Sequence, residues 1–133
     1  MNYPSLGAGL AMLAAFSAYI DQGSANATLV FYSDSKPSSI DTAADASKAL
    51  VTLTLPKPSL KQTNTDSINL QSTDTALVTT AGIATWARLY NGNGLAIMDF
   101  TVGSDITLLN NNLAEGSAVN LTSLKLKPYL GAE

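Results

Sequence analysis

The acidic side chains are the groups of this 133-residue chain best suited to chemistry, because the sequence contains no histidine and no cysteine. Without imidazole or thiolate groups, the usual ligand sets for zinc, copper and haem fail, as do the common pairs of nucleophile and base. We therefore expect a protein that is not an enzyme, with no catalytic residue, no metal site and no bound cofactor.

The spacing of the acidic residues favours solvated loop carboxylates. Asp34, Asp41 and Asp45 share one polar segment, but steps of seven and four residues do not form a calcium-binding loop. Asp99 and Asp105 are the nearest pair for glycoside hydrolysis, which needs two acids within about 10 Å. Nothing in the sequence singles out that pair.

Two other motifs carry weak chemical signals. The segment Asn91-Gly92-Asn93-Gly94 opens no helix, so it predicts a tight hairpin turn and not a phosphate-binding loop. Trp86, the only tryptophan, has the flat surface needed to stack on a sugar. A single tryptophan in the middle of a predicted strand is more typical of a protein core.

The charge content points to a subunit that meets other proteins. Only 13% of residues are charged and the net charge is −3, whereas about 25% of residues are charged in ordinary soluble domains. Thr, Ser, Ala, Leu and Asn take their place. The few cations form no basic stripe, so we expect no binding to nucleic acid. The cations are Lys36, Lys48, Lys57, Lys61, Arg88, Lys125 and Lys127.

Residues 5–21 are expected to form a helix. Apolar residues recur at steps of three and four, Ser5 can act as the N-cap, and Gly23 follows as a stop signal. The opposite face is Ala, Gly and Ser. The helix therefore either packs on its own domain alone or is covered on both faces, the second by a neighbouring subunit. The candidate subunit interface is Leu6, Leu10, Leu13 and Phe16.

The same apolar segment is neither a typical signal peptide nor a membrane span. No Lys or Arg precedes Lys36, so the positive region of a signal peptide is missing. The apolar stretch from Leu6 breaks at Asp21 and is too short to cross a bilayer. We expect no membrane association.

A period of two from residue 27 onward predicts a mainly β protein with one N-terminal helix. Residues 1–133 are expected to form one domain, in which 27–127 make an antiparallel β-sandwich or a jelly-roll-like barrel of 7–8 short strands. The expected strands are 27–33, 50–55, 68–70, 76–80, 83–90, 95–102, 106–109 and 118–127.

The last four of these strands are expected to form two hairpins, 83–90 with 95–102 and 106–109 with 118–127. A change of phase at Thr122–Ser123 predicts a β-bulge. A short helical turn is expected around 42–48. The expected core residues are Phe31, Leu53, Trp86, Leu89 and Met98.

The strand motifs of the second half are similar to a known family. They read Gly-Ile-Ala-Thr-Trp-Ala-Arg-Leu at 82–89, Ile-Met-Asp at 97–99, Val-Gly at 102–103 and Asp-Ile-Thr-Leu at 105–108, followed by the turn at 114–119. Phe-Tyr-Ser-Asp-Ser-Lys-Pro at 31–37 matches the front part. This chain resembles small structural proteins encoded in the virion-gene blocks of tailed phages and prophages. Asp34 and Phe100 depart from the pattern, and 56–80 match only in character.

The resemblance implies a virion structural protein without catalytic activity and leaves its location open. The first hypothesis is a capsid decoration or cement protein that binds the major capsid protein as a homo-oligomer, with a trimer favoured. The alternatives are a tail, connector or baseplate-associated protein, and a carbohydrate- or receptor-binding module of a head fibre or tail tip. Each would act in the virion, assembled in the bacterial cytoplasm. The candidate shell-contact loop contains Asp34, Lys36, Pro37 and Asp41.

Overall fold

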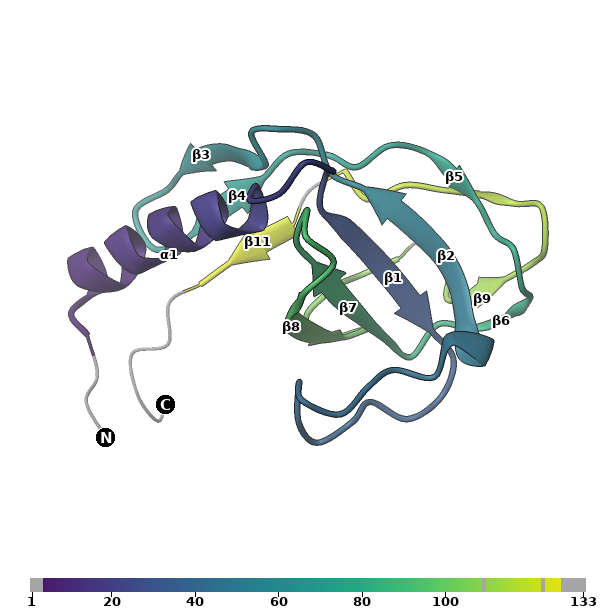
Figure 1. The fold of residues 1–133 in the computed structure, drawn as a ribbon. Coiled ribbons are helices and arrows are strands. Elements are labelled where there is room, and N and C mark those ends of the chain that lie inside the picture. The colour runs from purple at the N-terminus through teal and green to yellow at the C-terminus, as the bar shows by residue number, and fades with distance from the viewer. Residues whose placement is uncertain (1–3, 109, 123, 128–133) are drawn as a thin grey trace.

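The computed structural model describes residues 4–108, 110–122 and 124–127. The chain is mainly β, with one N-terminal helix and 11 short strands that pair antiparallel in four small sheets (Figure 1). The elements are α1 (Leu6–Ile20), β1 (Thr28–Tyr32), a 3₁₀ turn (Ala46–Lys48), β2 (Ala49–Thr54), β3 (Leu60–Thr63), β4 (Ile68–Leu70), β5 (Ala76–Leu77), β6 (Gly82–Ile83), β7 (Trp86–Tyr90), β8 (Ala96–Thr101), β9 (Asn112–Leu113), β10 (Ala118–Val119) and β11 (Leu124–Leu126).

The largest sheet has the order β2-β1-β7-β8, and the next has the order β11-β4-β3. The two remaining sheets are the pairs β10-β5 and β6-β9. One contiguous apolar cluster joins both larger sheets, because it contains Leu29 and Leu89 from the first and Ile68 and Leu126 from the second. The end of α1 closes this cluster with Ile20.

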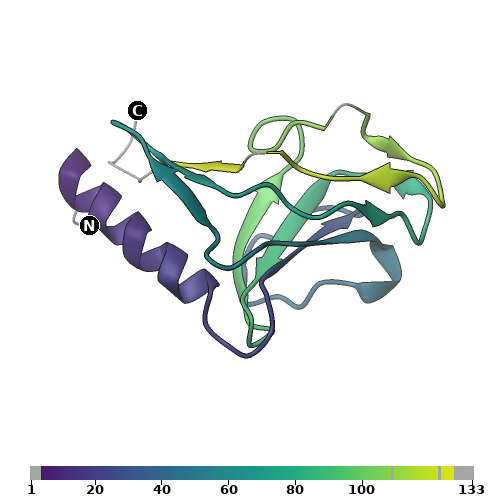
Figure 2. The ribbon, with the colours of Figure 1, turned by 90° about the horizontal axis from the view of Figure 1, so that it is seen from above.

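The N-terminal helix is confirmed. The Ser5 hydroxyl accepts a hydrogen bond from the Ala8 N–H at 3.2 Å, so it caps the first turn as expected. The helix ends at Ile20, and the Asp21 carboxylate accepts from the Ser59 N–H at 3.1 Å. The bond between Asp21 and Ser59 ties the end of α1 to the segment before β3, and α1 lies beside β3 and β4 at one end of the molecule (Figure 2).

The first predicted hairpin is also confirmed, as β7 and β8. In its turn, the Asn91 side-chain oxygen accepts from the N–H groups of Asn93 and Leu95 at 3.0 and 3.1 Å. Gly94 has the positive φ that the turn needs. Gly92 serves another purpose, because a side chain there would collide with the backbone of Ala25.

The strand number and the barrel alternative were wrong. The chain forms 11 strands where seven or eight were expected, and β3 and β9 were not predicted at all. The expected strand 83–90 is divided into β6 and β7. Across the described residues the strands form four small sheets and no closed barrel.

The second predicted hairpin was also wrong. Residues 106–108 form no strand apart from one isolated bridge at Ile106, and Leu109 lies outside the described residues. β10 pairs with β5, and β11 pairs with β4. The change of phase near Thr122 therefore accompanies a move from one sheet to another, and Ser123 lies outside the described residues.

One core prediction needs correction. Phe31, Leu53 and Leu89 are buried in the apolar cluster, and Met98 packs against it. Trp86 is fully buried but lies on the opposite face of the sheet, because Met98 pairs with Leu89, and neighbouring residues of a strand alternate between faces.

Candidate functional site

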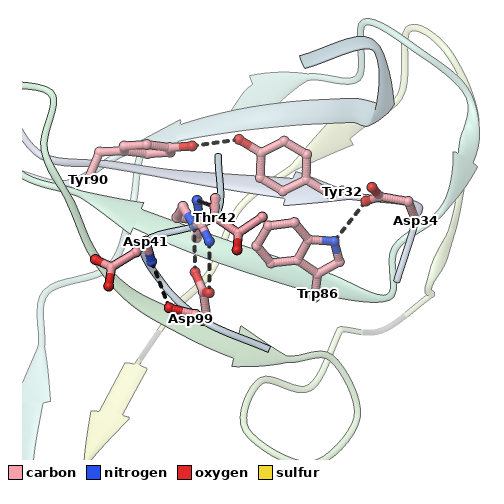
Figure 3. Close-up of polar contacts among 9 residues, drawn as sticks. Tyr32, Asp34, Asp41, Thr42, Trp86, Tyr90 and Asp99 are labelled. Carbon is pink, nitrogen blue, oxygen red and sulfur yellow. Dashed lines mark hydrogen bonds and ion pairs between the residues drawn. The ribbon is translucent and has the colours of Figure 1, made fainter. Parts of the chain in front are cut away.

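The outer face of the four-stranded sheet carries a cluster of aromatic and charged side chains (Figure 3). Trp86, Arg88 and Tyr90 alternate along β7 and so project to one side. Tyr32 of β1 pairs with Trp86, and Asp99 of β8 pairs with Arg88, which places both on the same face. The side chains best suited to chemistry therefore meet on this face.

Arg88 and Asp99 form a buried, two-point ion pair. The Arg88 Nε donates to one Asp99 oxygen at 2.7 Å, and Nη2 donates to the other at 3.0 Å. The exposed fraction is 2% for the Arg88 side chain and 12% for Asp99. The hydrogen bond with Asp99 raises the pKa of Arg88 further, so the guanidinium stays charged. Each partner compensates the burial of the other's charge.

The aromatic part of the cluster is tightly stacked. The Tyr32 and Trp86 rings have centroids 4.5 Å apart and planes 19° from parallel. The Arg88 Cζ lies 5.2 Å from the Trp86 ring centroid, in the range of a cation–π contact. The hydroxyls of Tyr32 and Tyr90 form a hydrogen bond at 2.8 Å. Burial raises the pKa of Tyr32, and the bond with Tyr90 raises it further.

The polar segment 34–48 closes over this cluster and is fastened at two points. The Trp86 indole N–H donates to the Asp34 carboxylate at 2.8 Å, and the Thr85 hydroxyl donates to the Asp34 carbonyl. Further along, the Arg88 Nη1 donates to the carbonyl of Thr42 at 2.7 Å. We name segment 34–42 the strap. Because the strap holds Trp86 fully buried, this indole presents no open face to a sugar.

The four predicted shell-contact residues all lie in the strap, but they differ in exposure. Asp34 is half-buried and holds Trp86, and Pro37 is also half-buried. Lys36 and Asp41 are exposed, and the Asp41 N–H donates to the Ser39 hydroxyl at 3.1 Å. Two of the four therefore remain at the surface, where a partner could contact them.

The acidic candidates Asp45 and Asp105 both bond to nearby groups of the chain. The Asp45 carboxylate accepts from the N–H and hydroxyl of Ser47, which lowers the pKa of Asp45. The Asp105 carboxylate accepts from the Thr101 N–H at 2.8 Å. Within residues 4–108, 110–122 and 124–127, no group of three acidic side chains lies close enough together to hold a metal ion.

No family model, curated protein or solved structure matches this chain. No helix within the described ranges has both the length and the apolar character needed to cross a bilayer. The function is therefore inferred from the surfaces of the chain itself. The first is the sheet face beneath the strap, and the second is the helix.

The predicted helix interface lies mostly inside the domain. Leu10, Leu13 and Phe16 are half-buried against the apolar cluster, while Leu6 is exposed. The face of α1 that points away from the core is formed by other residues, and we name it the outward helix face. Its side chains, all of which are exposed, are those of Ala8, Ala11, Met12, Ala14, Ala15, Ala18 and Tyr19.

The outward helix face contains no charge, since residues 6–20 include no Asp, Glu, Lys or Arg. Met12 is 62% exposed and Tyr19 is 38% exposed. A surface helix ordinarily presents charged and polar residues to water. Sequence reasoning missed Met12 and Tyr19 because it followed the longest apolar stripe, although the lack of charge at every position of the helix was already visible.

Proposed function

We propose that this protein is a non-enzymatic structural subunit of a tailed-phage virion, and specifically a capsid decoration or cement protein. The observation that carries the proposal is the uncharged outward helix face on a small, charge-poor β protein. The mechanism is association alone. The resemblance to small virion proteins is the reason for proposing a phage particle. The outward helix face is the surface that another subunit can cover.

Covering the outward helix face is energetically favourable and buries no charge. Burial of apolar surface contributes roughly 25 cal/mol per Å². A charged residue on this face would have to lose its hydration without a partner, at a cost of several kcal/mol. Small side chains at Ala8, Ala11 and Ala15 also let a second helix approach closely. The assembly that we propose is a homo-oligomer, with a trimer favoured.

The cluster beneath the strap supports a role without catalysis. Arg88, Asp99, Asp34 and Trp86 all bond to one another or to the strap, so they hold the fold together. The exposed part of the strap, with Lys36 and Asp41, is the proposed contact with the major capsid protein. In this proposal the larger sheets act as the two layers of a β-sandwich, which forms a rigid base for both surfaces.

Multiple weak contacts would be enough for binding to a capsid. An oligomer on a repeating shell presents several identical contacts, and each added contact acts at high effective concentration. A tail, connector or baseplate-associated protein could use the same surfaces, and the number of copies per particle separates these locations. The third candidate, a carbohydrate-binding module, needs an exposed aromatic ring to stack on the sugar, but Trp86 is fully buried.

The proposal is tested by sedimentation of the purified protein, alone and with capsids from which it has been stripped. The wild-type protein should be an oligomer and should co-sediment with the stripped capsids. Ala15→Glu should weaken self-association by about tenfold, equivalent to about 1.4 kcal/mol. Ala114→Glu is the matched control, since Ala114 is an exposed alanine outside the helix. A monomeric wild-type protein that ignores stripped capsids would contradict the proposal.

A further inference from the structure

A groove of about 630 Å³ lies between α1, β8 and β11. Its floor is apolar and its rim is charged. The apolar residues that line it are Leu13, Met98, Phe100 and Leu126, and the polar ones are Asp99, Ser104, Asp105, Lys125 and Lys127. No other strand of the described chain is hydrogen-bonded to the outer edge of β8 or of β11, because each is the last strand of its sheet.

The free edge of β8 has unused backbone groups. The Thr101 N–H donates to Asp105, and the Thr101 carbonyl accepts from the Asp105 and Ile106 N–H groups, so the Thr101 backbone points away from β7. Backbone groups two residues apart in a strand point the same way. The Asp99 N–H and carbonyl therefore face the free edge, while the Asp99 side chain binds Arg88.

The free edge of β11 is organised in the same way. The Gln71 N–H donates to the Ser59 carbonyl at 2.6 Å, beside the pair formed by Leu60 and Leu70. In an antiparallel ladder this pattern directs the Leu70 backbone away from β3 and toward Leu124 of β11. The next residue, Lys125, must then direct its N–H and carbonyl to the free edge.

The charges on the rim are unbalanced. Arg88 neutralises Asp99, whereas Asp105 keeps its negative charge while its carboxylate accepts from the Thr101 N–H. Lys125 and Lys127 are exposed, and neither forms an ion pair within the part of the chain that the structure describes. The two lysines outnumber the one uncompensated carboxylate, so the groove has a cationic rim, although the whole chain carries a net charge of −3.

We propose that this groove binds an extended, acidic peptide segment of another protein chain by addition of a β-strand. Only an extended backbone can pair with two strand edges, and addition to a free edge is a common mode of peptide recognition. Alternate apolar side chains of the segment would lie on the floor formed by Met98 and Leu126. Its carboxylates would face Lys125 and Lys127. The proposal does not depend on the virion role.

The test uses the full chain labelled with ¹⁵N and a synthetic hexapeptide, acetyl-Glu-Val-Thr-Val-Glu-Val-amide. Saturable shifts are expected at the backbone amides of Asp99 and Lys125, with a Kd below about 1 mM. The same peptide with alternate amides N-methylated has lost backbone donors and should bind at least about tenfold more weakly. A version with Lys in place of Glu should be weakened by a similar factor because it opposes the cationic rim.

A pair of protein variants locates the binding. Lys125→Glu should weaken the binding of the acidic peptide by about fivefold or more, whereas Lys61→Glu should leave it unchanged. Lys61 is a matched control because it is exposed on β3, the opposite edge strand of the same sheet. Both variants should keep the wild-type thermal stability.

Three results would overturn the proposal. The first is the absence of saturable shifts at Asp99 and Lys125 with the acidic peptide. The second is equal binding of the N-methylated peptide, which would mean that the backbone does not pair. The third is a change at the same two amides with protein concentration alone, which would show that a second copy of this chain occupies the groove.

Discussion

The outer face of the four-stranded sheet and the outward helix face have opposite compositions and opposite exposures. The sheet face has an arginine, an aspartate, a tryptophan and two tyrosines, and it is covered by the strap. The helix face has only alanine, methionine and tyrosine, and it is open to water. On the sheet face the charged and aromatic side chains bond to one another or to the strap, whereas on the helix face the side chains open to a partner are uncharged.

The largest expected effect is at Trp86. Trp86→Ala should lower the free energy of unfolding by about 4 kcal/mol, because it removes the stack with Tyr32 and leaves a cavity beneath the strap. Trp86→Phe keeps an aromatic ring and loses the bond to Asp34 and part of the indole volume, so its loss should be smaller. Urea denaturation measures both. A loss below about 1 kcal/mol for Trp86→Ala would show that the strap does not depend on the indole.

The buried ion pair should give the next largest effect. Arg88→Met leaves the Asp99 carboxylate buried without its partner and should cost about 3 kcal/mol. Adding Asp99→Leu removes the unpaired charge, so the double variant should be more stable than Arg88→Met alone. A double-mutant cycle measured by urea denaturation checks this. Additive losses would mean that the two side chains act independently.

Tyr32 should give a smaller, pH-dependent effect. Because its pKa is raised in the folded state, the associated stability is fully present below the unfolded pKa of about 10 and is lost as the pH rises further. Tyr32→Phe should cost about 1 kcal/mol at neutral pH and should flatten the decline above pH 10. Thermal unfolding between pH 8 and about 11 measures both.

Tyr19→Phe is the control for this prediction, since Tyr19 lies on the exposed outward helix face. It removes an exposed tyrosine hydroxyl and should change the free energy of unfolding by less than about 0.5 kcal/mol. A decline above pH 10 that is identical in the wild-type protein and in Tyr32→Phe would show that other groups cause it.

The smallest effect on stability is expected on the helix. Met12→Lys should change the free energy of unfolding by less than about 0.5 kcal/mol, because the side chain is already exposed. It should nevertheless weaken self-association by about tenfold, since it places a charge in the proposed contact. Leu77→Lys is the matched control, because Leu77 is also 62% exposed. Equal effects of both variants on self-association would remove the distinction between α1 and the rest of the surface.

Local signals in the sequence predicted local structure well. The capping hydroxyl of Ser5 and the apolar period located α1, and the Asn-Gly turn at 91–94 located the hairpin β7–β8. The pairs β5–β10 and β4–β11 join residues about 40 to 60 positions apart, and no short-range pattern encodes such partners. β3 was missed because Leu60 is its only strongly apolar residue.

The candidate site was harder to predict than the fold. The contact between Asp34 and Trp86 spans 52 positions, so no local sequence pattern links the two residues. The parity of β7 held one usable signal, because Arg88 and Trp86 are two residues apart and must share a face. An arginine on the same face as Trp86 argues against an apolar core on that face. A buried arginine needs an acidic partner, and Asp99 is such a residue on the next strand.

The most direct test of the virion role is the number of copies in purified particles. Quantitative mass spectrometry of particles of the phage proposed to encode this chain gives its ratio to the major capsid protein. A decoration protein should be present in hundreds of copies, in a fixed proportion to the capsid subunits. A few tens of copies would place the protein in the tail or connector. Absence from washed particles would contradict the virion role itself.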